Sequence, residues 1–442
     1  MLLFWFAVTI VLLVVLISKL KVHAFLTLLI MAVFFGLCAG IPTTELPALI
    51  VGGFGNTMTS IGVVIACGVV IGSFLEYTGG AQKIADAILK LIGIKRATYA
   101  TSATGAFVSI PVFCDSGFVI LNPIIKGLSR RGKIPYASLV VALMAGLLCT
   151  HSFVPPTPGP VAAAGLYGAE IGQVMFYGLI VSVPVVVVCS IWANSRFVKG
   201  AFPEVAPVSE LDAKQEADFE KVVEHAPSTF MSFIPVALPI LIIILKSFFG
   251  SAEGNIFQQV LDFIGTPWVA LLIGTMICFL LPTKLNETVT SGWVAKSLEG
   301  AAEIMCITAA AGGFAAVLQA TDIGTILTDL VLRVGLPAVF VPYLMAALIN
   351  MAQGSATVAL TTVGGILAPM LPALGLHPVV ATLATAAGSL SFCHTNSSYF
   401  WCVTKLGNLK LNQSYRLITL TSVMMGATAM VVICILNLTV FA

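Results

Sequence analysis

The stretch "CTHSFVPPTPGP", residues 149–160, places four prolines and a glycine between two long apolar runs. Each proline removes a backbone hydrogen-bond donor and clashes with the preceding helical turn, so an ordinary bilayer-crossing helix avoids such a cluster. Non-helical backbone is tolerated at membrane depth only where it is buried in protein or lines a cavity. The stretch therefore predicts a broken helix beside a functional site.

The composition indicates a membrane protein. Of the 442 residues, 59% are hydrophobic and 9% are charged, whereas a soluble domain has about 25% charged residues. Apolar segments of about 20 residues, long enough to cross roughly 30 Å of hydrocarbon, recur along the chain. The ten cysteines are scattered through apolar segments without metal-ligand spacing. We therefore expect neither a metal site nor a cofactor.

The apolar segments predict an all-α protein with about ten transmembrane helices and two re-entrant hairpins. The ten predicted spans are 2–18, 22–40, 57–76, 136–165, 171–195, 230–249, 266–282, 296–318, 376–400 and 415–440. The two hairpins cover about 97–130 and about 337–372. The first is flanked by basic residues on both sides, namely Lys95, Arg96, Arg130, Arg131 and Lys133.

Positive charge marks the cytoplasmic side of a membrane protein, so both ends of the first hairpin are expected in the cytoplasm. With both termini outside, every Lys and Arg except Lys246 and Arg333 lies on the cytoplasmic side. The amphipathic stretches 79–95 and 321–335 are expected to lie at the interface. They are interpreted as arms that link a scaffold to a moving domain.

The two halves of the chain repeat. An offset of 243 residues without a gap aligns Asp86 with Asp329 and His151 with His394. Under the predicted topology, the aligned spans run in opposite directions, which is the inverted repeat of many secondary transporters. The predicted division is an N-terminal half (1–198), a cytoplasmic linker (199–229) and a C-terminal half (230–442).

The interruptions in both halves predict a substrate site. Backbone N–H groups at the start of each half-helix make an anion site, because the helix dipole is positive there. Hydroxyl and amide side chains near the breaks suit a small anion with several hydroxyl groups. The candidate substrate-binding residues are Ser116, Asn122, His151, Ser152, Thr157, Gln353, Ser355, Thr357, His394, Thr395, Asn396 and Ser397, with Thr361 and Thr362 nearby.

Four titratable residues are candidates for proton coupling. Asp115 lies in an apolar hairpin, where an ionisable side chain is expensive and functional by default. His151 and His394 stand at equivalent breaks, and histidine titrates near neutral pH. Glu303, near the inner end of its predicted span, is a further candidate. The other interpretations are a carboxylate that caps the hairpin tip, neutral core histidines and a glutamate that reaches the interface.

Four segments resemble the gluconate permease (GntP) family of the ion transporter superfamily. They are "HSFVPPTPGPVAAAG" (151–165), "FCDSGFVILNPI" (113–124), "QGSATVALTT" (353–362) and "GSLSFCHTNSSYFW" (388–401). The resemblance covers essentially the whole chain. It implies a multi-pass protein of the bacterial inner membrane that imports gluconate or a related sugar acid with protons. It also implies a homodimer with scaffold and transport domains and elevator-like movement.

One segment departs from the family pattern. The family usually has His-x-Asn-Asp where this chain has "HTNS" at 394–397, so Ser397 replaces an acid and Tyr399 adds bulk. The sequence therefore leaves open a D-serine or other small organic anion carrier, and sodium in place of protons. A channel and a membrane-embedded enzyme are less favoured. The chain has no G-x-S-x-G, HExxH or Walker lysine motif, which argues against an enzyme or an ATP-driven pump.

Overall fold

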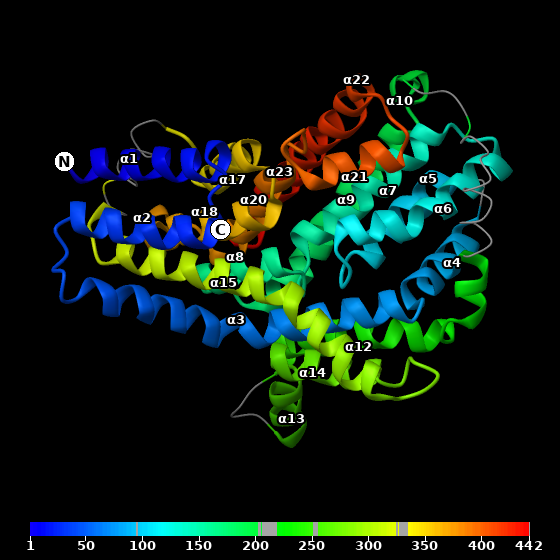
Figure 1. The fold of residues 1–442 in the computed structure, drawn as a ribbon, viewed down its shortest axis with the longest axis horizontal. Coiled ribbons are helices and arrows are strands. Elements are labelled where there is room, and N and C mark those ends of the chain that lie inside the picture. Colours follow the sequence, from blue (N-terminus) through cyan, green and yellow to red (C-terminus); the bar gives the residue numbers. More distant parts are fainter. Residues whose placement is uncertain are drawn as a thin grey trace.

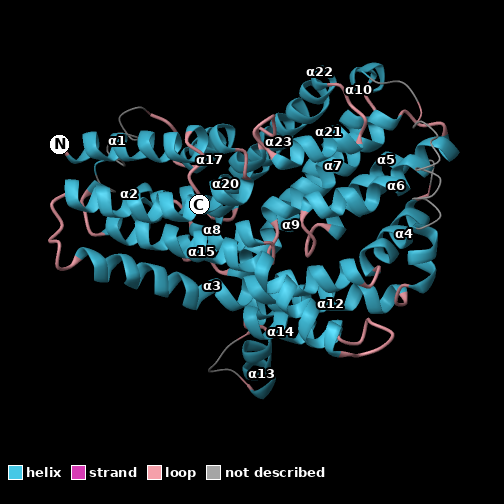
Figure 2. Ribbon diagram, viewed as in Figure 1, coloured by secondary structure: helices cyan, strands magenta, loops and turns pink. Residues whose placement is uncertain are grey.

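The computed structural model describes residues 1–93, 96–201, 205, 219–250, 255–323, 326 and 335–441. Within these ranges every regular element is helical (Figures 1 and 2). The predicted all-α class is therefore confirmed.

The helices of the first half are α1 (Leu2–Val14), η1 (Val15–Lys19), α2 (Ala24–Cys38), α3 (Leu46–Tyr77), α4 (Gly80–Ile92), α5 (Ala97–Val108), α6 (Cys114–Gly132), α7 (Tyr136–Phe153), α8 (Pro158–Tyr167), α9 (Ile171–Ala193) and α10 (Arg196–Ala201). Those of the second half are α12 (Thr229–Phe249), α13 (Ile256–Ile264), α14 (Pro267–Cys278), η3 (Thr288–Trp293), α15 (Val294–Gln319), α17 (Phe340–Gln353), α18 (Ala356–Leu367), η4 (Ala368–Met370), α19 (Leu371–Leu374), α20 (Pro378–Leu390), α21 (Ser398–Leu406), α22 (Leu411–Ser414), η5 (Tyr415–Thr419) and α23 (Leu420–Thr439).

The order of elements is the same in the two halves. In each, a long helix (α3 or α15) is followed by a helical hairpin (α5–α6 or α17–α18), a broken helix (α7–α8 or α20–α21) and a long final helix (α9 or α23). This shared order supports the predicted repeat. The opposite orientation of the halves in the membrane stays a prediction.

Several helices are long and apolar enough to cross a bilayer. Among the described residues there are seven such helices, and Leu46–Tyr77, Tyr136–Tyr167 and Thr288–Gln319 are the longest at 32 residues each. An eighth candidate is the pair α13–α14, which is bent by 71°. A multi-pass membrane protein is thus confirmed, whereas the count of ten spans remains a prediction.

The long helices α3 and α15 pack closely along the same side of the molecule (Figure 1). Glycine makes this approach possible, because a Cβ at Gly53 would lie 2.6 Å from the Cβ of Ala316, and one at Gly312 would collide with the hydroxyl of Thr57. Small residues at helix contacts are the usual means of close packing in membranes. The pair α3–α15 therefore forms a rigid wall beside the hairpins.

The helices α7 and α20 form the centre of the fold. All residues of α7 are buried, and so is α20 from Val379 to Leu390. A helix that is apolar all round is buried either in protein or in lipid, and protein surrounds both of these helices. Because each of these helices ends at a break, the protein core fixes the position of both breaks.

Some predicted boundaries were wrong. The span predicted at 57–76 belongs to a helix that already begins at Leu46, since the run of glycines and Asn56 lowers the apparent hydrophobicity of its first turns. The span predicted at 376–400 ends as α20 at Leu390. The expected interfacial stretch 79–95 forms α4, which ends at Ile92. Some predicted features lie outside the described residues. They are Lys95 of the hairpin flank, residues 206–218 of the linker, and most of the stretch 321–335, which includes Arg333.

Candidate functional site

The tip of the first hairpin exposes the start of a helix. Between α5 and α6, residues 109–113 form a turn in which the hydroxyl of Ser109 donates to the carbonyl of Val112 at 3.0 Å. Phe113 is the N-cap residue of α6, and its side chain makes no capping hydrogen bond. Asp115 lies in the first turn of the helix. The first N–H groups of α6 therefore point beyond the helix end, where the dipole is positive.

Two glycines of α3 contact the first hairpin and the first break. A Cβ at Gly72 would collide with the carbonyl oxygen of Pro111, and one at Gly68 would lie 3.0 Å from the carbonyl oxygen of Pro156. The small cavity left there is about 10 Å³, room for about one water molecule. A substrate can therefore enter this gap only if the hairpin tip moves away from α3. The residues that line the cavity are Gly68, Val69, Pro111, Phe113, Pro156, Thr157 and Pro158.

The first break places a histidine beside this tip. His151, in the last turn of α7, is buried, and its ring lies 5.8 Å from the ring of Phe113. The hydroxyl of Thr157 donates to the carbonyl of Val154 at 2.6 Å and closes the unwound segment. The half-helix α8 begins with Pro158, Gly159 and Pro160, and proline has no N–H. Of these three residues, only Gly159 has an N–H to offer an anion.

The second hairpin tip and the second break are tied together by side chains. The ring Nε2 of His394 donates to the carbonyl of Met351 at 2.8 Å, and the amide of Asn396 donates to the same oxygen at 3.2 Å. The hairpin turns at Gly354, whose φ is +83°, and a Cβ there would collide with the carbonyl oxygen of Asn396. The hydroxyl of Ser355 caps α18 by accepting the N–H of Val358 at 3.4 Å.

The interrupted segments of the two halves also meet each other. The thiol of Cys402, in α21, donates to the carbonyl of Asp115 at 3.8 Å, so the first hairpin tip contacts the second broken helix. A Cβ at Gly159 would lie 3.5 Å from the Cα of Thr357, so the first break contacts the second hairpin. Both hairpins and both broken helices thus converge on one region.

Several polar side chains in this region have an atom without a hydrogen-bond partner among the described residues. Asp115 Oδ1, His151 Nδ1 and Ser152 Oγ are buried and have no hydrogen-bond partner among the described residues. Buried polar atoms in native proteins nearly always have a partner. These atoms are therefore available to a substrate, a proton or water.

Asn122, in contrast, lies away from the tips. It stands two turns along α6, where its Oδ1 accepts from the hydroxyl of Tyr136 at 2.6 Å and its amide donates to the carbonyl of Leu406 at 3.3 Å. The hydroxyl of Tyr136 also donates to that carbonyl at 3.0 Å. In this conformation Asn122 joins α6, α7 and the end of α21.

The other predicted residues lie in the second hairpin and at the second break. The amide of Gln353 donates to the carbonyl of Ser355 at 2.9 Å, and the hydroxyl of Thr361 donates to the carbonyl of Thr357 at 2.8 Å. The hydroxyl of Thr395 lies 3.2 Å from that of Tyr415. Two further hydroxyl residues are buried, namely Thr362, whose Oγ1 has no partner among the described residues, and Ser397 at the start of α21.

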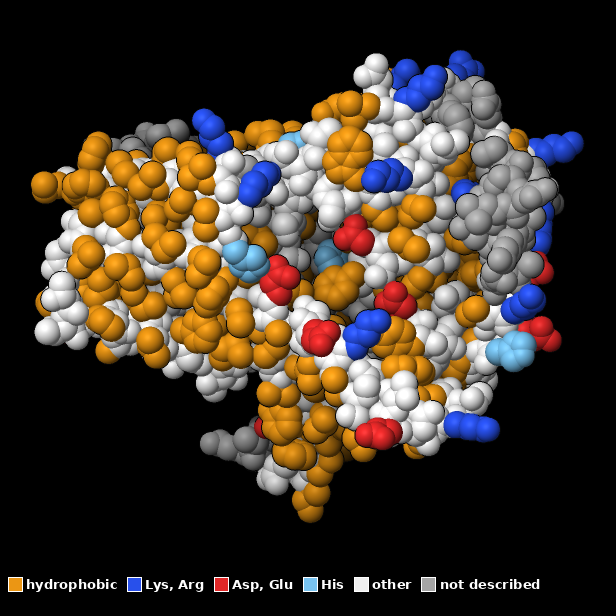
Figure 3. Space-filling view, viewed as in Figure 1, with side chains coloured by type: hydrophobic (Ala, Val, Ile, Leu, Met, Phe, Trp, Pro, Cys, Tyr) orange, Lys and Arg blue, Asp and Glu red, His pale blue; other side chains and the backbone are white. Residues whose placement is uncertain are grey.

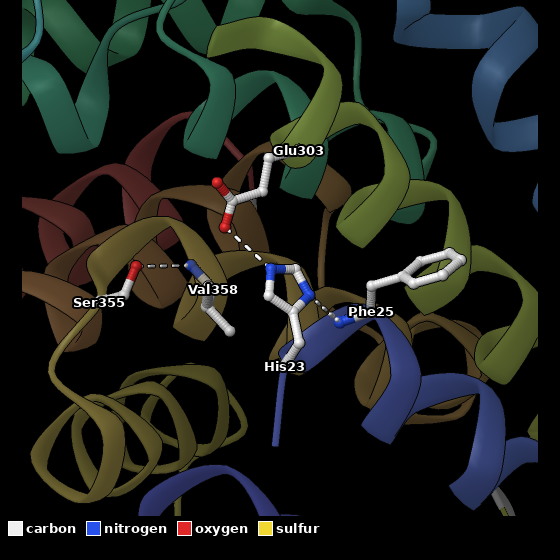
Figure 4. A network of polar contacts seen from close by, with 5 residues as sticks. All are labelled: His23, Phe25, Glu303, Ser355 and Val358. Atoms are coloured by element: carbon white, nitrogen blue, oxygen red, sulfur yellow. Dashed lines mark hydrogen bonds and ion pairs between the residues drawn. The ribbon is translucent and has the colours of Figure 1, made fainter. Parts of the chain in front are cut away.

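Two residues at the site were missed by the sequence analysis. The carboxylate of Glu76, near the end of α3, lies beside the hydroxyl of Ser116 at the first hairpin tip. His23 hydrogen-bonds to Glu303 at 3.0 Å (Figure 4). Nothing in the sequence alone connects two residues that are 280 positions apart.

Larger cavities lie elsewhere. One of about 540 Å³ is open between α3 and α15 and includes Asn56, Ser60 and Gln319 in its wall. No charged side chain lines it, so it offers an anion neither a cation nor a coupling carboxylate. Within the described ranges, no group of three or more His, Cys, Asp or Glu side chains could hold a metal ion.

Comparison with known proteins decides the class of this protein. The model of the GntP family permeases matches residues 1–439. The chain belongs to the GntP permease family. It is 32% identical over 440 residues to a gluconate permease of Pseudomonas aeruginosa, with 98% of this chain and 96% of that protein covered. It is 32% identical over 437 residues to the inner membrane permease YgbN of Escherichia coli, with 96% and 95% covered.

The fold agrees with this assignment. The solved structure of Neisseria gonorrhoeae MtrF, described as one of a class of antimetabolite efflux pumps, superposes with a TM-score of 0.71 at 15% identity and covers 96% of each chain. This GntP permease is therefore a multi-pass transporter of the inner membrane, as the sequence predicted, and not an enzyme.

Proposed function

We propose that this GntP permease imports gluconate or a related sugar acid by proton symport. The convergence of two hairpin tips and two breaks around the half-buried carboxylate of Asp115 and the buried ring of His151 carries this proposal, because each has a polar atom without a hydrogen-bond partner among the described residues. An anionic substrate needs positive potential, which the start of α6 and of α21 supply without a fixed cation. A sugar acid also needs hydroxyl partners, which Ser152, Thr357 and Ser397 can provide.

In this mechanism the residues divide into three roles. The substrate carboxylate lies at the start of α6 near Ser116, and its hydroxyls reach the side chains on the rims of both breaks. Asp115 and His151 carry the coupled proton, because each has a buried polar atom without a hydrogen-bond partner among the described residues. His394 and Asn396 hydrogen-bond to a carbonyl near the end of α17. These hydrogen bonds therefore depend on the position of the second hairpin tip.

We infer the movement that exposes the site to each side from the packing. The wall of α3 and α15 belongs to the scaffold, and the hairpins with the broken helices move against it as an elevator. Gly68 and Gly72 of α3 let the scaffold contact the moving elements without side chains that would interlock. A homodimer, joined through the scaffolds, would hold the scaffolds still in the bilayer.

Reconstituted protein tests the proposal. Proteoliposomes that contain the purified permease should accumulate labelled gluconate when the outside is acidic, with no sodium present. An inward sodium gradient alone should have no effect. Accumulation driven only by sodium would refute proton symport. If gluconate does not enter while D-serine shows saturable uptake under the same proton gradient, the proposal that the substrate is a sugar acid is refuted.

A further inference from the structure

Glu303 occupies a position that its sequence context does not explain. It lies near the middle of the 32-residue helical segment Thr288–Gln319, not near the inner end as expected. A carboxylate at the centre of a membrane-length helix is costly unless it faces a cavity or a partner. Its side chain is 65% exposed and that of His23 is 48% exposed. Figure 3 shows acidic and histidine side chains gathered around a hollow in the middle of one face.

The hydrogen bonds of His23 define its protonation. Its Nδ1 accepts the N–H of Phe25 at 3.3 Å and thereby caps α2. The proton of a neutral ring is then on Nε2, which donates to the carboxylate of Glu303 at 3.0 Å. A proton added to the pair neutralises it, whether that proton stays on the imidazole or passes to the carboxylate. The pair then changes from a net charge of −1 to zero.

The pair stands beside the second hairpin. Helix α15, which carries Glu303, packs against both α2 and α18. Figure 4 shows the pair in one view with the Ser355 cap at the start of α18. The hairpin segment 337–372 contains no Asp, Glu, Lys, Arg or His. The hairpin therefore supplies no charge of its own to offset that of the pair.

The other charged groups around the pair come from neighbouring elements. Lys19 and Lys21 precede the α2 cap and are exposed. Lys296 and Glu299 lie earlier on α15, Glu287 precedes η3, and Glu45 and Glu76 stand at the two ends of α3. None of these is joined to Glu303 by an ion pair among the described residues, where its one ion-pair partner is His23.

We propose that His23 and Glu303 form a coupling pair that must take up a proton before the second hairpin moves with an anionic substrate. Without that proton, the negative pair faces an uncharged hairpin that brings a second negative charge, and like charges repel. With the added proton on the pair, this repulsion is absent, and the second hairpin can move together with the bound anion. This inference rests on the proposed import of an anion with protons.

The test separates movement from coupling. Glu303→Gln keeps the size and hydrogen-bonding capacity of the side chain but fixes its charge at zero. The variant should exchange labelled gluconate across proteoliposomes at equal concentrations, which also shows that it is folded. It should not accumulate gluconate under a proton gradient. A gradient of two pH units drives at most about 100-fold accumulation for one proton per substrate, since each pH unit is worth a factor of ten. The expected ratio for Glu303→Gln is about one.

Two further variants complete the experiment. Glu299→Gln, one turn earlier on the exposed face of α15, is the control and should accumulate gluconate as the wild type does. His23→Phe removes the ring N–H that donates to Glu303, so it should lower accumulation while keeping exchange at equal concentrations.

The outcomes distinguish the pair from the proposed function. If Glu303→Gln accumulates gluconate as the wild type does, the proposed coupling role of the pair is wrong, while proton symport still stands. An equal defect in Glu299→Gln would overturn it also, because the effect would then be one of general surface charge. If the wild type itself neither exchanges nor accumulates gluconate, the proposed function fails and the role of the pair fails with it.

Discussion

The contact between the second hairpin tip and the second break can be tested with a pair of glycines. Gly354 and Gly375 both have positive φ, +83° and +60°. An L-residue in this conformation costs about 1–2 kcal/mol, so alanine at either position should lower the stability by that amount. Only Gly354 has atoms nearby, namely the backbone of Asn396 and Ser397, whereas nothing lies within 4 Å of a Cβ at Gly375.

The difference between the two variants isolates the contact. Because the atoms around Gly354 belong to the backbone, they cannot rotate away, and overpacking of this kind adds about 1–3 kcal/mol. Gly354→Ala should therefore unfold at a clearly lower temperature than Gly375→Ala in a thermal denaturation assay in detergent. It should also lose most gluconate uptake, since the tip is pushed off the break, while Gly375→Ala should keep it. Equal melting temperatures and equal uptake would refute the close approach of tip and break.

Three more predictions follow from the site. Asp115→Asn and His151→Ala should each abolish gluconate accumulation in proteoliposomes but leave the elution volume in size-exclusion chromatography unchanged; wild-type uptake in both would contradict their role. Tyr136→Phe should destabilise the protein by about 1–3 kcal/mol, because it leaves Asn122 Oδ1 without its donor in the protein core. Chemical denaturation would measure this loss, and a change within error would count against the buried network. Gly72→Ala should reduce uptake more than it reduces stability, since its Cβ meets the turn of the moving hairpin; normal uptake would show that the hairpin does not rest there.

The architecture of the site could be predicted from local sequence signals. The proline cluster at 155–160 marks a break because proline cannot continue a helix. The basic residues on both sides of 97–130 mark a hairpin because they keep both ends on one side of the membrane. Each of these signals acts over a few residues, so it is readable without knowledge of the fold.

The direction of individual side chains could not be predicted in the same way. Asn122 is polar and close to the tip in sequence, yet its amide lies among Tyr136 and Leu406. Glu76 stands at the end of a span, yet it reaches Ser116 on the first hairpin. These outcomes depend on how helices from distant parts of the chain rotate against each other, which hydrophobic periodicity does not determine in segments that are apolar on every side.

The central claim is that substrate binds where the two tips and the two breaks converge. A cryo-electron microscopy map of the permease in lipid nanodiscs with gluconate tests this most directly. The ligand density should lie between the start of α6 and the start of α21, in contact with Ser116 and within reach of His151. Ligand density in the cavity between α3 and α15, beside Asn56 and Gln319, would contradict the claim.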